Sequence, residues 1–440
     1  MIKPFFYYQQ HQINKALLVG LGISGISVIK YLSAYTINID IFDQKNKSNH
    51  YIVDYEVFDN INLEVYDLIV VAPGIPLNRS PFTWLSSYWH KVVGDIELFS
   101  AHITQKKQKV VAITGSNGKS TVASLLHHIL SALCIRVALG GNIGIPALSI
   151  INDNVDIYVL EVSSFQIDLL KKAQFDVVSM LNLSPDHVDR YKDYMGYCDS
   201  KLALLARGKY VVMNAKHKEF TASVSHNNFN YFNTNNTYAN CTTAIFEGEI
   251  FCEQSEVFLQ GKHNLENIVS VLVMLQGLMT FSDNLIAIIK KAVMDFMPLA
   301  HRCSLVRKFA GIRFINDSKA TNIASVEAAI IGLGSADKNI IILLGGIAKG
   351  ANFCGLTPVL KRYVKKTFIY GRDRMFIYAA IANEVSCELC DNLDQAFSFG
   401  ASLACGNDIV LLSPGCASFD DFLSYVHRGE HFETLVKKIR

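Results

Sequence analysis

The stretch Lys109–Leu133, KVVAITGSNGKSTVASLLHHILSAL, gives the clearest structural signal in the chain. It opens with Val110–Ile113, a short apolar run rich in β-branched residues, which predicts a buried strand of a parallel sheet. A loop of glycine, serine and asparagine follows, and an amphipathic helix is predicted from Lys119 onward. The buried stripe of that helix is predicted at Val122, Leu125, Leu126, Ile129, Leu130 and Leu133.

This order of strand, glycine loop and helix is typical of a phosphate-binding loop. Bare backbone N–H groups, the N-terminus of the helix and the side chain of Lys119 would converge on one point, which suits a polyphosphate. Ser120 stands where the hydroxyl of a P-loop ligates the Mg²⁺ that accompanies a nucleotide. The loop is shorter than the usual G-x-x-x-x-G-K-[ST], because Gly115 is only three residues before Gly118. The flanking strand and helix, more than the short motif, therefore favour a phosphate site.

Length and charge narrow the range of functions. A chain of 440 residues is expected to form two or three domains, and half of its residues are hydrophobic, which is ample for sizeable cores. The 41 basic and 39 acidic residues nearly cancel, so we expect neither nucleic acid nor a membrane as a partner. The N-terminus lacks the apolar core of a signal peptide, and the longest apolar stretch, Ile268–Phe281, is too short to cross a bilayer. Ten cysteines without a secretion signal indicate reduced thiols and a cytoplasmic protein.

Residues 15–43, KALLVGLGISGISVIKYLSAYTINIDIFD, contain a second nucleotide-type pattern. A strand meets the turn Gly20-x-Gly22-x-x-Gly25, a helix follows, and a second strand ends in Asp43. By spacing this is a dinucleotide fingerprint with an acid placed for a ribose hydroxyl, so a nicotinamide-dependent oxidoreductase has to be considered. The same geometry binds any nucleotide diphosphate, and a tight turn without a ligand is the plainer alternative.

Polar residues follow several further predicted strands. Val70–Pro76 reads as a strand that runs into a Pro/Gly turn, which falls at the ligand-binding edge of an open parallel sheet. Glu161 directly follows the buried strand 157–160, downstream of the phosphate loop, and is therefore a candidate Mg²⁺ ligand. The strand Val177–Leu181 precedes Asp186-His187-Val188-Asp189, which by itself does not identify a metal site.

The last third of the chain repeats the pattern of strand, turn and helix, which predicts another mostly parallel sheet. Lys319 and Thr321 follow one of its strands, Lys349 follows another, and the run Ser413–Phe422 follows a third. Several such residues at the carboxyl ends of one sheet suggest a second anionic ligand. The predicted strands are Ile312–Ile315, Ile340–Leu344, Thr367–Tyr370 and Ile409–Leu412.

Taken together, these ordered motifs resemble those of the Mur ligases, and the resemblance covers nearly the whole chain. It implies an α/β protein of three domains: a Rossmann-like UDP-binding domain at 1–97, a central P-loop ATPase-like domain with a mostly parallel sheet at 98–300, and a Rossmann-like amino-acid-binding domain at 301–440. LNLSPDHVDRY, NDSKATN and SPGCASFDDF match the members that add D-glutamate. The other matching stretches are GLGISG, TGSNGKST, GGNIG, LEVSSFQ, GKHNLEN and HR.

The resemblance also implies an activity. An ATP-dependent ligase would join D-glutamate to UDP-N-acetylmuramoyl-L-alanine through an acyl phosphate, releasing ADP and phosphate, in cytoplasmic peptidoglycan precursor synthesis. It implies two Mg²⁺ sites, and we expect a monomer. The alternatives, besides the oxidoreductase, are another Mur-type ligase, a folylpolyglutamate-type ligase and a non-catalytic nucleotide-binding protein. The folylpolyglutamate-type ligases share TGSNGKS but offer no account of GLGISG.

The resemblance also implies roles for individual residues. Catalysis is implied for Lys119, Glu161, His187 and Lys201. ATP would be bound by Gly115, Ser116, Asn117, Gly118, Lys119, Ser120, Thr121, Asn264, Asn267, Arg302 and Asp317. The UDP-sugar would be bound by Gly22, Ile23, Ser24, Asp43, Ala72, Pro73, Gly74 and Asn142. D-Glutamate would be bound by Lys319, Thr321, Lys349, Ser418, Phe419 and Tyr425. The metal ligands would be Ser120, Glu161, His187 and Lys201.

Lys201 matches the lysine that the family carries as an N-carbamate. Addition of CO₂ to a neutral amine turns a cation into an anionic ligand with two oxygens, the kind of ligand that Mg²⁺ prefers.

Overall fold

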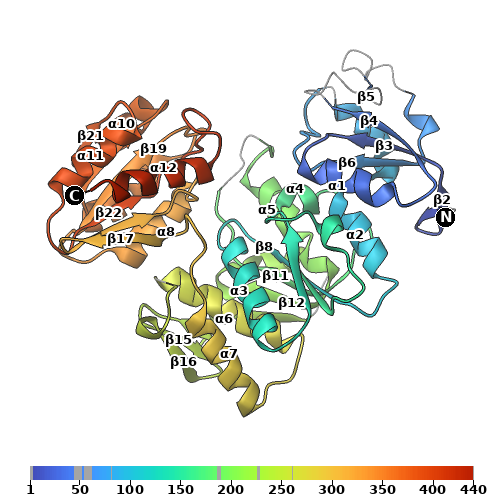
Figure 1. Ribbon diagram of the computed structural model, residues 1–440, viewed down its shortest axis with the longest axis horizontal. Coiled ribbons are helices and arrows are strands. Elements are labelled where there is room, and N and C mark those ends of the chain that lie inside the picture. The colour runs from blue at the N-terminus through green and yellow to red at the C-terminus, as the bar shows by residue number, and fades with distance from the viewer. Residues whose placement is uncertain are drawn as a thin grey trace. The chain divides into compact units, whose positions relative to one another are not determined.

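The computed structural model describes residues 3–43, 52–53, 62–80, 82–185, 190–224, 228–259 and 261–439. The chain forms two compact units, Met1–Thr234 with Ser270–Ala292, and Asn235–Val269 with Val293–Arg440. Each six-stranded or five-stranded sheet has its own helices packed against it (Figure 1). Buried apolar side chains between sheets and helices form the cores.

The N-terminal sheet of the first unit has the strand order of a Rossmann fold. Its five described strands are all parallel and lie in the order β5-β4-β3-β6-β7. When these strands are renumbered from 1 in chain order, beginning at β3, the spatial order is 3-2-1-4-5. The order reverses between β3 and β6, and in open α/β sheets ligands bind in the crevice at that reversal. The bounds are β5 (Ile52–Val53), β4 (Asn38–Phe42), β3 (Lys15–Val19), β6 (Leu68–Val71) and β7 (Val92–Val93), with helices α1 (Ile23–Leu32) and α2 (Asp95–Ile103) and a preceding hairpin of β1 (Phe6–Tyr8) and β2 (His11–Ile13).

The second sheet of this unit is parallel throughout its six described strands, and β8 lies near its middle. The apolar residues of β8 are buried, and so is the predicted stripe of α3 apart from its half-exposed last residue, Leu133. The strands, in spatial order, are β13 (Phe229–Phe232), β12 (Gly208–Asn214), β11 (Phe175–Met180), β8 (Lys109–Thr114), β10 (Ile157–Glu161) and β9 (Val137–Gly141). The helices are α3 (Lys119–Ala132), α4 (Ser164–Ile167), α5 (Tyr194–Leu202), α6 (Lys262–Gln276) and α7 (Asp283–Asp295), of which α6 and α7 continue into the second unit.

The C-terminal sheet of the second unit buries both of its faces. Along β19, Ile340, Ile342 and Leu344 join one apolar cluster, whereas Ile341 and Leu343 join another. This alternation is the two-residue period of a strand covered on both sides. The strands, in spatial order, are β17 (Ser304–Phe309), β18 (Ile312–Asn316), β22 (Ile409–Leu412), β19 (Ile340–Gly345), β20 (Val364–Tyr370) and β21 (Cys387–Leu389). The helices are α8 (Ile323–Leu333), α9 (Thr357–Tyr363), α10 (Arg374–Ile381), α11 (Leu393–Leu403) and α12 (Tyr425–Lys437).

Smaller elements complete the chain. The asparagine-rich region contributes β13 to the central sheet and part of a separate antiparallel sheet. That sheet comprises β14 (Tyr238–Ala239), β15 (Thr243–Phe246) and β16 (Glu249–Glu253). Short 3₁₀ helices occupy Leu63–Val65, Phe82–Lys91, Ala147–Ile150, Leu205–Arg207, Ala215–Ser223, Gln254–Glu256 and Phe353–Leu356.

The α/β class, the mostly parallel sheets and the predicted strands are confirmed. The antiparallel strand β17, at the edge of the C-terminal sheet, was not predicted from the sequence. Residue 97 lies inside α2, so the proposed end of the first domain falls within a helix, and the domain bounds stay a prediction.

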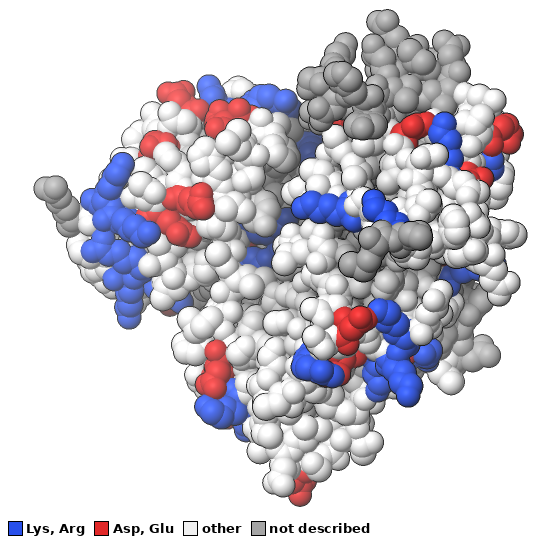
Figure 2. All heavy atoms as spheres, turned by 45° about the vertical axis from the view of Figure 1, so that its right-hand side comes forward, with Lys and Arg blue, Asp and Glu red and all other residues white. Residues whose placement is uncertain are grey.

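Three features of the structure relate to predictions made from the composition. Within the described residues, no helix combines the length and apolar character that crossing a bilayer requires. All ten cysteines are free thiols. Basic and acidic side chains lie next to each other on the face shown in Figure 2, as the balanced composition leads one to expect.

Candidate active site

The loop between β8 and α3 has the backbone that a short phosphate loop needs. Gly118 caps α3 in the left-handed region, with φ of +84°. Gly115 has φ of +150°, and a Cβ there would lie 3.1 Å from the Cβ of Leu181, so a larger residue would be strained. Two loop N–H groups are not bare as expected, because Ser116 and Asn117 donate to the carbonyl and side-chain oxygens of Asn182, at 2.9 and 2.8 Å. The loop is therefore fixed to the end of β11.

Two lysines meet at one carbonyl of this loop. Lys119 Nζ donates to the Gly115 oxygen at 2.7 Å and to the Ser116 oxygen at 2.9 Å. Lys201, on α5 and only 2% exposed, donates to the same Gly115 oxygen at 3.0 Å. Like charges this close repel each other, and burial opposes a second positive charge. Conversion of the Lys201 amine to an anionic carbamate would replace this repulsion with attraction.

Glu161 joins the phosphate loop to the GGNIG turn. It ends β10 opposite Ile113 of β8 and is 3% exposed. One carboxylate oxygen accepts a hydrogen bond from the Ser120 hydroxyl, and the other accepts one from the Asn142 side-chain amide at 2.7 Å. A carboxylate and a hydroxyl in contact beside a phosphate loop are the oxygen donors that Mg²⁺ takes, so these residues fit the implied metal. His187, with Asp186 and Asp189, lies outside the described residues.

The N-terminal sheet gathers the residues predicted for the UDP-sugar at one edge, except Asn142, which follows β9 of the central sheet. Gly22–Ser24 follow β3, Asp43 follows β4, and Ala72–Gly74 follow β6, which are three neighbouring parallel strands. The Leu21 N–H donates to Asp43 Oδ2 at 2.6 Å, so the acid is already tied to the glycine turn. A Cβ on Gly25 would lie 2.1 Å from the Gly20 carbonyl oxygen, which explains the glycine where α1 packs closely on the strand.

Arg190 connects this edge to the central domain and was not found from the sequence. Its guanidinium donates to the carbonyl oxygens of Pro73, Gly74 and Ile75 at 3.3, 3.0 and 2.9 Å. The Asn78 side-chain amide donates in return to the Arg190 carbonyl oxygen at 2.9 Å. These partners are separated by more than a hundred residues, so no local pattern could have indicated the contact.

The second unit gathers the residues predicted for D-glutamate. Lys319 and Thr321 follow β18, Lys349 follows β19, and Ser418 follows β22, which lies between those two strands. Ile347 and Ala417 exchange backbone hydrogen bonds at 2.9 and 3.0 Å, so the second and third loops are paired. The remaining two residues lie on the third loop and its helix: Phe419 is 68% exposed, and the ring of Tyr425 has the Lys319 Nζ 4.1 Å from its centroid.

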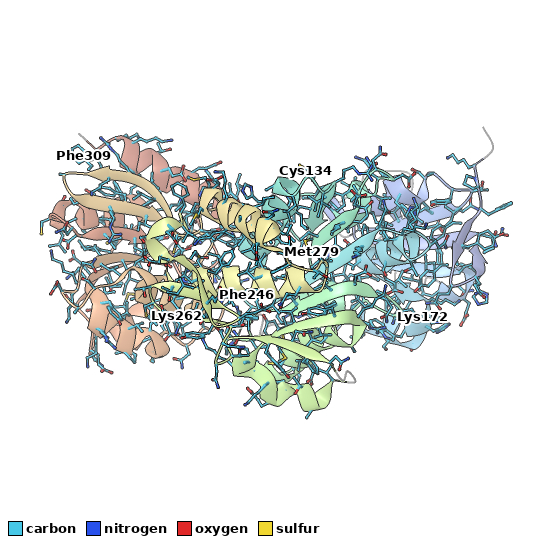
Figure 3. All side chains as sticks on the ribbon, turned by 90° about the horizontal axis from the view of Figure 1, so that it is seen from below. Cys134, Lys172, Phe246, Lys262, Met279 and Phe309 are labelled. Atoms are coloured by element: carbon cyan, nitrogen blue, oxygen red, sulfur yellow. The ribbon has the colours of Figure 1, made fainter. Side chains whose placement is uncertain are left out.

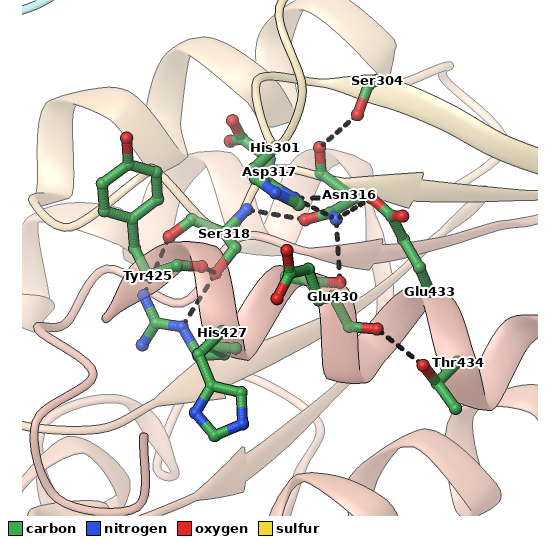
Figure 4. Close-up of polar contacts among 12 residues, drawn as sticks. His301, Ser304, Asn316, Asp317, Ser318, Tyr425, His427, Glu430, Glu433 and Thr434 are labelled. Carbon is green, nitrogen blue, oxygen red and sulfur yellow. Dashed lines mark hydrogen bonds and ion pairs between the residues drawn. The ribbon is translucent and has the colours of Figure 1, made fainter. Parts of the chain in front are cut away.

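Asp317 is a buried acid at the same edge (Figure 4). It accepts hydrogen bonds from the Ser413 hydroxyl at 2.8 Å and from the Cys303 N–H at 3.1 Å. Burial nevertheless raises the pKa of Asp317 to about 7, and the nearby charge of Arg302 only partly opposes this rise. Asn264 and Asn267 lie in the first turns of α6, both buried, and the Asn267 amide donates to Asn264 at 3.1 Å. Because α6 begins at Lys262, Asn264 is not its N-cap.

A cavity of about 720 Å³ lies away from these residues. It is lined by Lys109 and Ile157, which begin β8 and β10, and by Met279, labelled in Figure 3. The phosphate loop and Glu161 lie at the opposite, carboxyl ends of the same strands. This cavity is therefore not part of the candidate site.

Three family models match successive parts of the chain. They describe the MurD-like N-terminal domain of Mur ligases at residues 14–94, the Mur ligase middle domain at 113–275 and the Mur ligase glutamate ligase domain at 301–416.

Named relatives match over nearly the full length. The UDP-N-acetylmuramoylalanine–D-glutamate ligase of Francisella tularensis subsp. tularensis is 41% identical over 436 residues, which cover 99% of this chain and 98% of the relative. The enzyme of that name from Francisella philomiragia is 40% identical over 441 residues, 99% of each chain.

Solved structures share the fold. The MurF ligase of Thermotoga maritima in complex with ADP has a TM-score of 0.62 and 17% identity, over 99% of each chain. The UDP-N-acetylmuramate-alanine ligase of the same organism has a TM-score of 0.60 and 13% identity, over 97% of this chain and 99% of that one.

Proposed function

The chain belongs to the Mur ligase family, and from this premise we propose that it adds D-glutamate to UDP-N-acetylmuramoyl-L-alanine with conversion of ATP to ADP and phosphate. The observation that carries the proposal is the 41% identity, over 99% of the chain, to ligases of that name. We discard the alternative of a nicotinamide-dependent oxidoreductase, because residues 14–94 match the N-terminal domain of MurD-like Mur ligases.

The reaction has two steps. An oxygen of the L-alanyl carboxylate attacks the γ-phosphorus of ATP, ADP leaves, and an acyl phosphate forms. The D-glutamate amine then attacks the acyl carbon, the C–O bond to phosphate breaks, and the nitrogen loses a proton. Both steps bring negatively charged oxygens together, so the catalyst has to neutralise charge and hold three reactants in line.

The chain offers groups for each of these tasks. Lys119 would neutralise phosphate charge, since its ammonium already lies on the phosphate loop. Ser120 and Glu161, together with His187 and a carbamate on Lys201, would hold Mg²⁺, which supplies further charge neutralisation when bound. The contact of Glu161 with both Ser120 and Asn142 supports this assignment, because Asn142 is one of the residues proposed to bind the sugar nucleotide, which carries the reacting carboxylate.

The amino-acid site is proposed on the loops that follow β18, β19 and β22. A dicarboxylate needs more than one cation or hydroxyl donor, and the loops present Lys319, Lys349 and Ser418. The pairing of Ile347 with Ala417 supports a common site, because it joins the loops that carry Lys349 and Ser418.

The test is phosphate release from ATP in the presence of UDP-N-acetylmuramoyl-L-alanine and a panel of D- and L-amino acids. Release that requires both the sugar nucleotide and D-glutamate supports the proposal. Release with a different amino acid keeps the ligase chemistry and overturns the proposed roles of Lys319, Lys349 and Ser418. Release with no combination refutes the proposed function. A monomer acting in the cytoplasm stays a prediction, which sedimentation and cell fractionation test.

A further inference from the structure

Arg428, on α12, is a buried cation without an acidic partner. Its side chain is among the largest that are fully buried, with 0% exposure. Among the residues that the structure describes, no Asp or Glu forms an ion pair with it, and all of its hydrogen bonds go to neutral oxygens. A buried charge is costly unless it is paired, so this arrangement calls for an explanation.

The guanidinium contacts the three loops of the proposed D-glutamate site. Nε donates to Ser318 Oγ at 3.0 Å, and Nη2 donates to the Ser318 carbonyl oxygen at 2.8 Å and to that of Cys416 at 3.1 Å. Nη1 makes a longer contact of 3.5 Å with the Gly345 oxygen. Ser318 Oγ in turn donates to the Tyr425 carbonyl oxygen at 2.8 Å (Figure 4).

These contacts fix the direction of the peptide groups that lead into the site. In a trans peptide the N–H of one residue points away from the carbonyl of the residue before it. Carbonyl groups of Ser318 and Cys416 that point at Arg428 therefore direct the next stretches, which carry Lys319 and Ser418, away from it. One guanidinium thus sets the orientation of two loops and contacts the third.

Two acidic residues act on the thiol that neighbours Arg428. Asp373 and Asp420 act electrostatically on the neighbouring Cys416 thiol and help burial to raise the pKa of that thiol. Asp373, however, accepts the Ala348 N–H at 2.8 Å, and Asp420 accepts the Arg372 N–H at 3.0 Å. Neither carboxylate hydrogen-bonds Arg428, so the guanidinium has no direct ionic partner among the described residues, and it lies beneath the loops that carry Lys319 and Ser418.

We propose that Arg428 is a positioning residue of the D-glutamate site, which orients the loops bearing Lys319 and Ser418 and supplies unpaired positive charge behind a bound dicarboxylate. This role rests on the proposed function. It predicts a selective effect, because Arg428 hydrogen-bonds Ser318, Gly345 and Cys416, none of which is proposed to bind ATP or the sugar nucleotide.

The test compares Arg428→Met with Arg307→Met in the full-length enzyme. Arg307 is a matched control, because its guanidinium also donates to carbonyl oxygens, those of Val436 and Ile439, which are not residues of the proposed site. Arg428→Met is expected to raise KM for D-glutamate about 10-fold or more, the loss expected for a charged hydrogen-bond donor. KM for ATP and for the sugar nucleotide is expected to change less than about two-fold. Arg307→Met is expected to leave all three values unchanged.

Arg428→Lys keeps the charge but not the fork of donors, so its KM for D-glutamate is expected between wild type and Arg428→Met. If Arg428→Met does not fold, Arg428→Lys is measured in its place. A folded variant with an unchanged KM for D-glutamate overturns the proposal, and so does an equal rise in KM for all three substrates. A wild-type enzyme that is inactive with D-glutamate refutes the proposed function instead, so the two failures are distinguished.

Discussion

Replacement of Arg190 by alanine is expected to weaken the sugar-nucleotide site without touching the ATP site. The side chain makes two hydrogen bonds of 2.9 and 3.0 Å and a longer one of 3.3 Å to the turn that follows β6. Its guanidinium also lies 4.1 Å from the ring centroid of Phe165, which holds it over the central domain. Without these contacts, the turn at Pro73–Ile75 loses three hydrogen bonds to that domain.

The size of the effect follows from the number and setting of these bonds. A hydrogen bond from a charged donor contributes about 1.5–3 kcal/mol when buried, and less where water competes, as at the half-buried Arg190. Two good bonds at a reduced value give about 2–3 kcal/mol, which corresponds to roughly 30- to 150-fold in affinity. We therefore expect KM for UDP-N-acetylmuramoyl-L-alanine to rise by that factor in Arg190→Ala.

The assay is phosphate release with each substrate varied in turn. Arg136→Ala is the control, because Arg136 pairs with Asp156 near the amino ends of the central strands, away from the proposed site. It should behave as wild type. An Arg190→Ala enzyme with an unchanged KM for the sugar nucleotide, or with an equal rise for ATP, would show that the contact does not position the turn.

Four further outcomes are expected. Lys119→Ala should lower turnover on the order of 10²-fold or more, since the positive charge that neutralises the phosphates is lost. Near-normal turnover in the phosphate-release assay would show that the phosphate loop takes no part in the reaction. Lys201→Ala should abolish turnover, with partial recovery when a small carboxylate is added; retained activity would argue against a carbamate. Burial raises the pKa of Asp317 from 3.8 to about 7, so the contribution of this carboxyl to the stability of the ligand-free protein is present below about pH 4 and lost as the pH rises through 7, by at most roughly 4 kcal/mol. The free energy of unfolding, measured with urea at several pH values, should therefore depend less on pH in Asp317→Asn than in the wild type. An equal pH dependence in the two proteins would contradict the raised pKa of Asp317. Glu97 is 2% exposed, and its carboxylate accepts hydrogen bonds from the N–H groups of residues 171–173 at 2.8–3.1 Å. Glu97→Gln should therefore lower the free energy of unfolding in urea by about 2–4 kcal/mol. An unchanged unfolding midpoint would show that the charge of Glu97 does not stabilise this turn.

Local sequence was sufficient for the elements at the centre of each sheet. Parallel strands buried on both faces are continuous apolar runs, so Val110–Ile113 and Ile409–Leu412 could be recognised without any knowledge of their neighbours. The edge strand β17, Ser304–Phe309, is half exposed and mixed in composition, and only its pairing with β18 defines it as a strand. The phosphate loop was found for a similar reason, because its strand, glycines and helix are consecutive.

What the sequence by itself determined is therefore the set of strand-turn-helix units and, by resemblance, the family. The tertiary structure decided which polar groups meet. It placed Lys119 and Lys201 on one carbonyl and Arg190 on the turn after β6, and it placed Arg428 beneath three loops. The physical reason is range: backbone periodicity and turn chemistry act over a few residues, whereas these contacts join segments that only the packing of sheets and helices brings together.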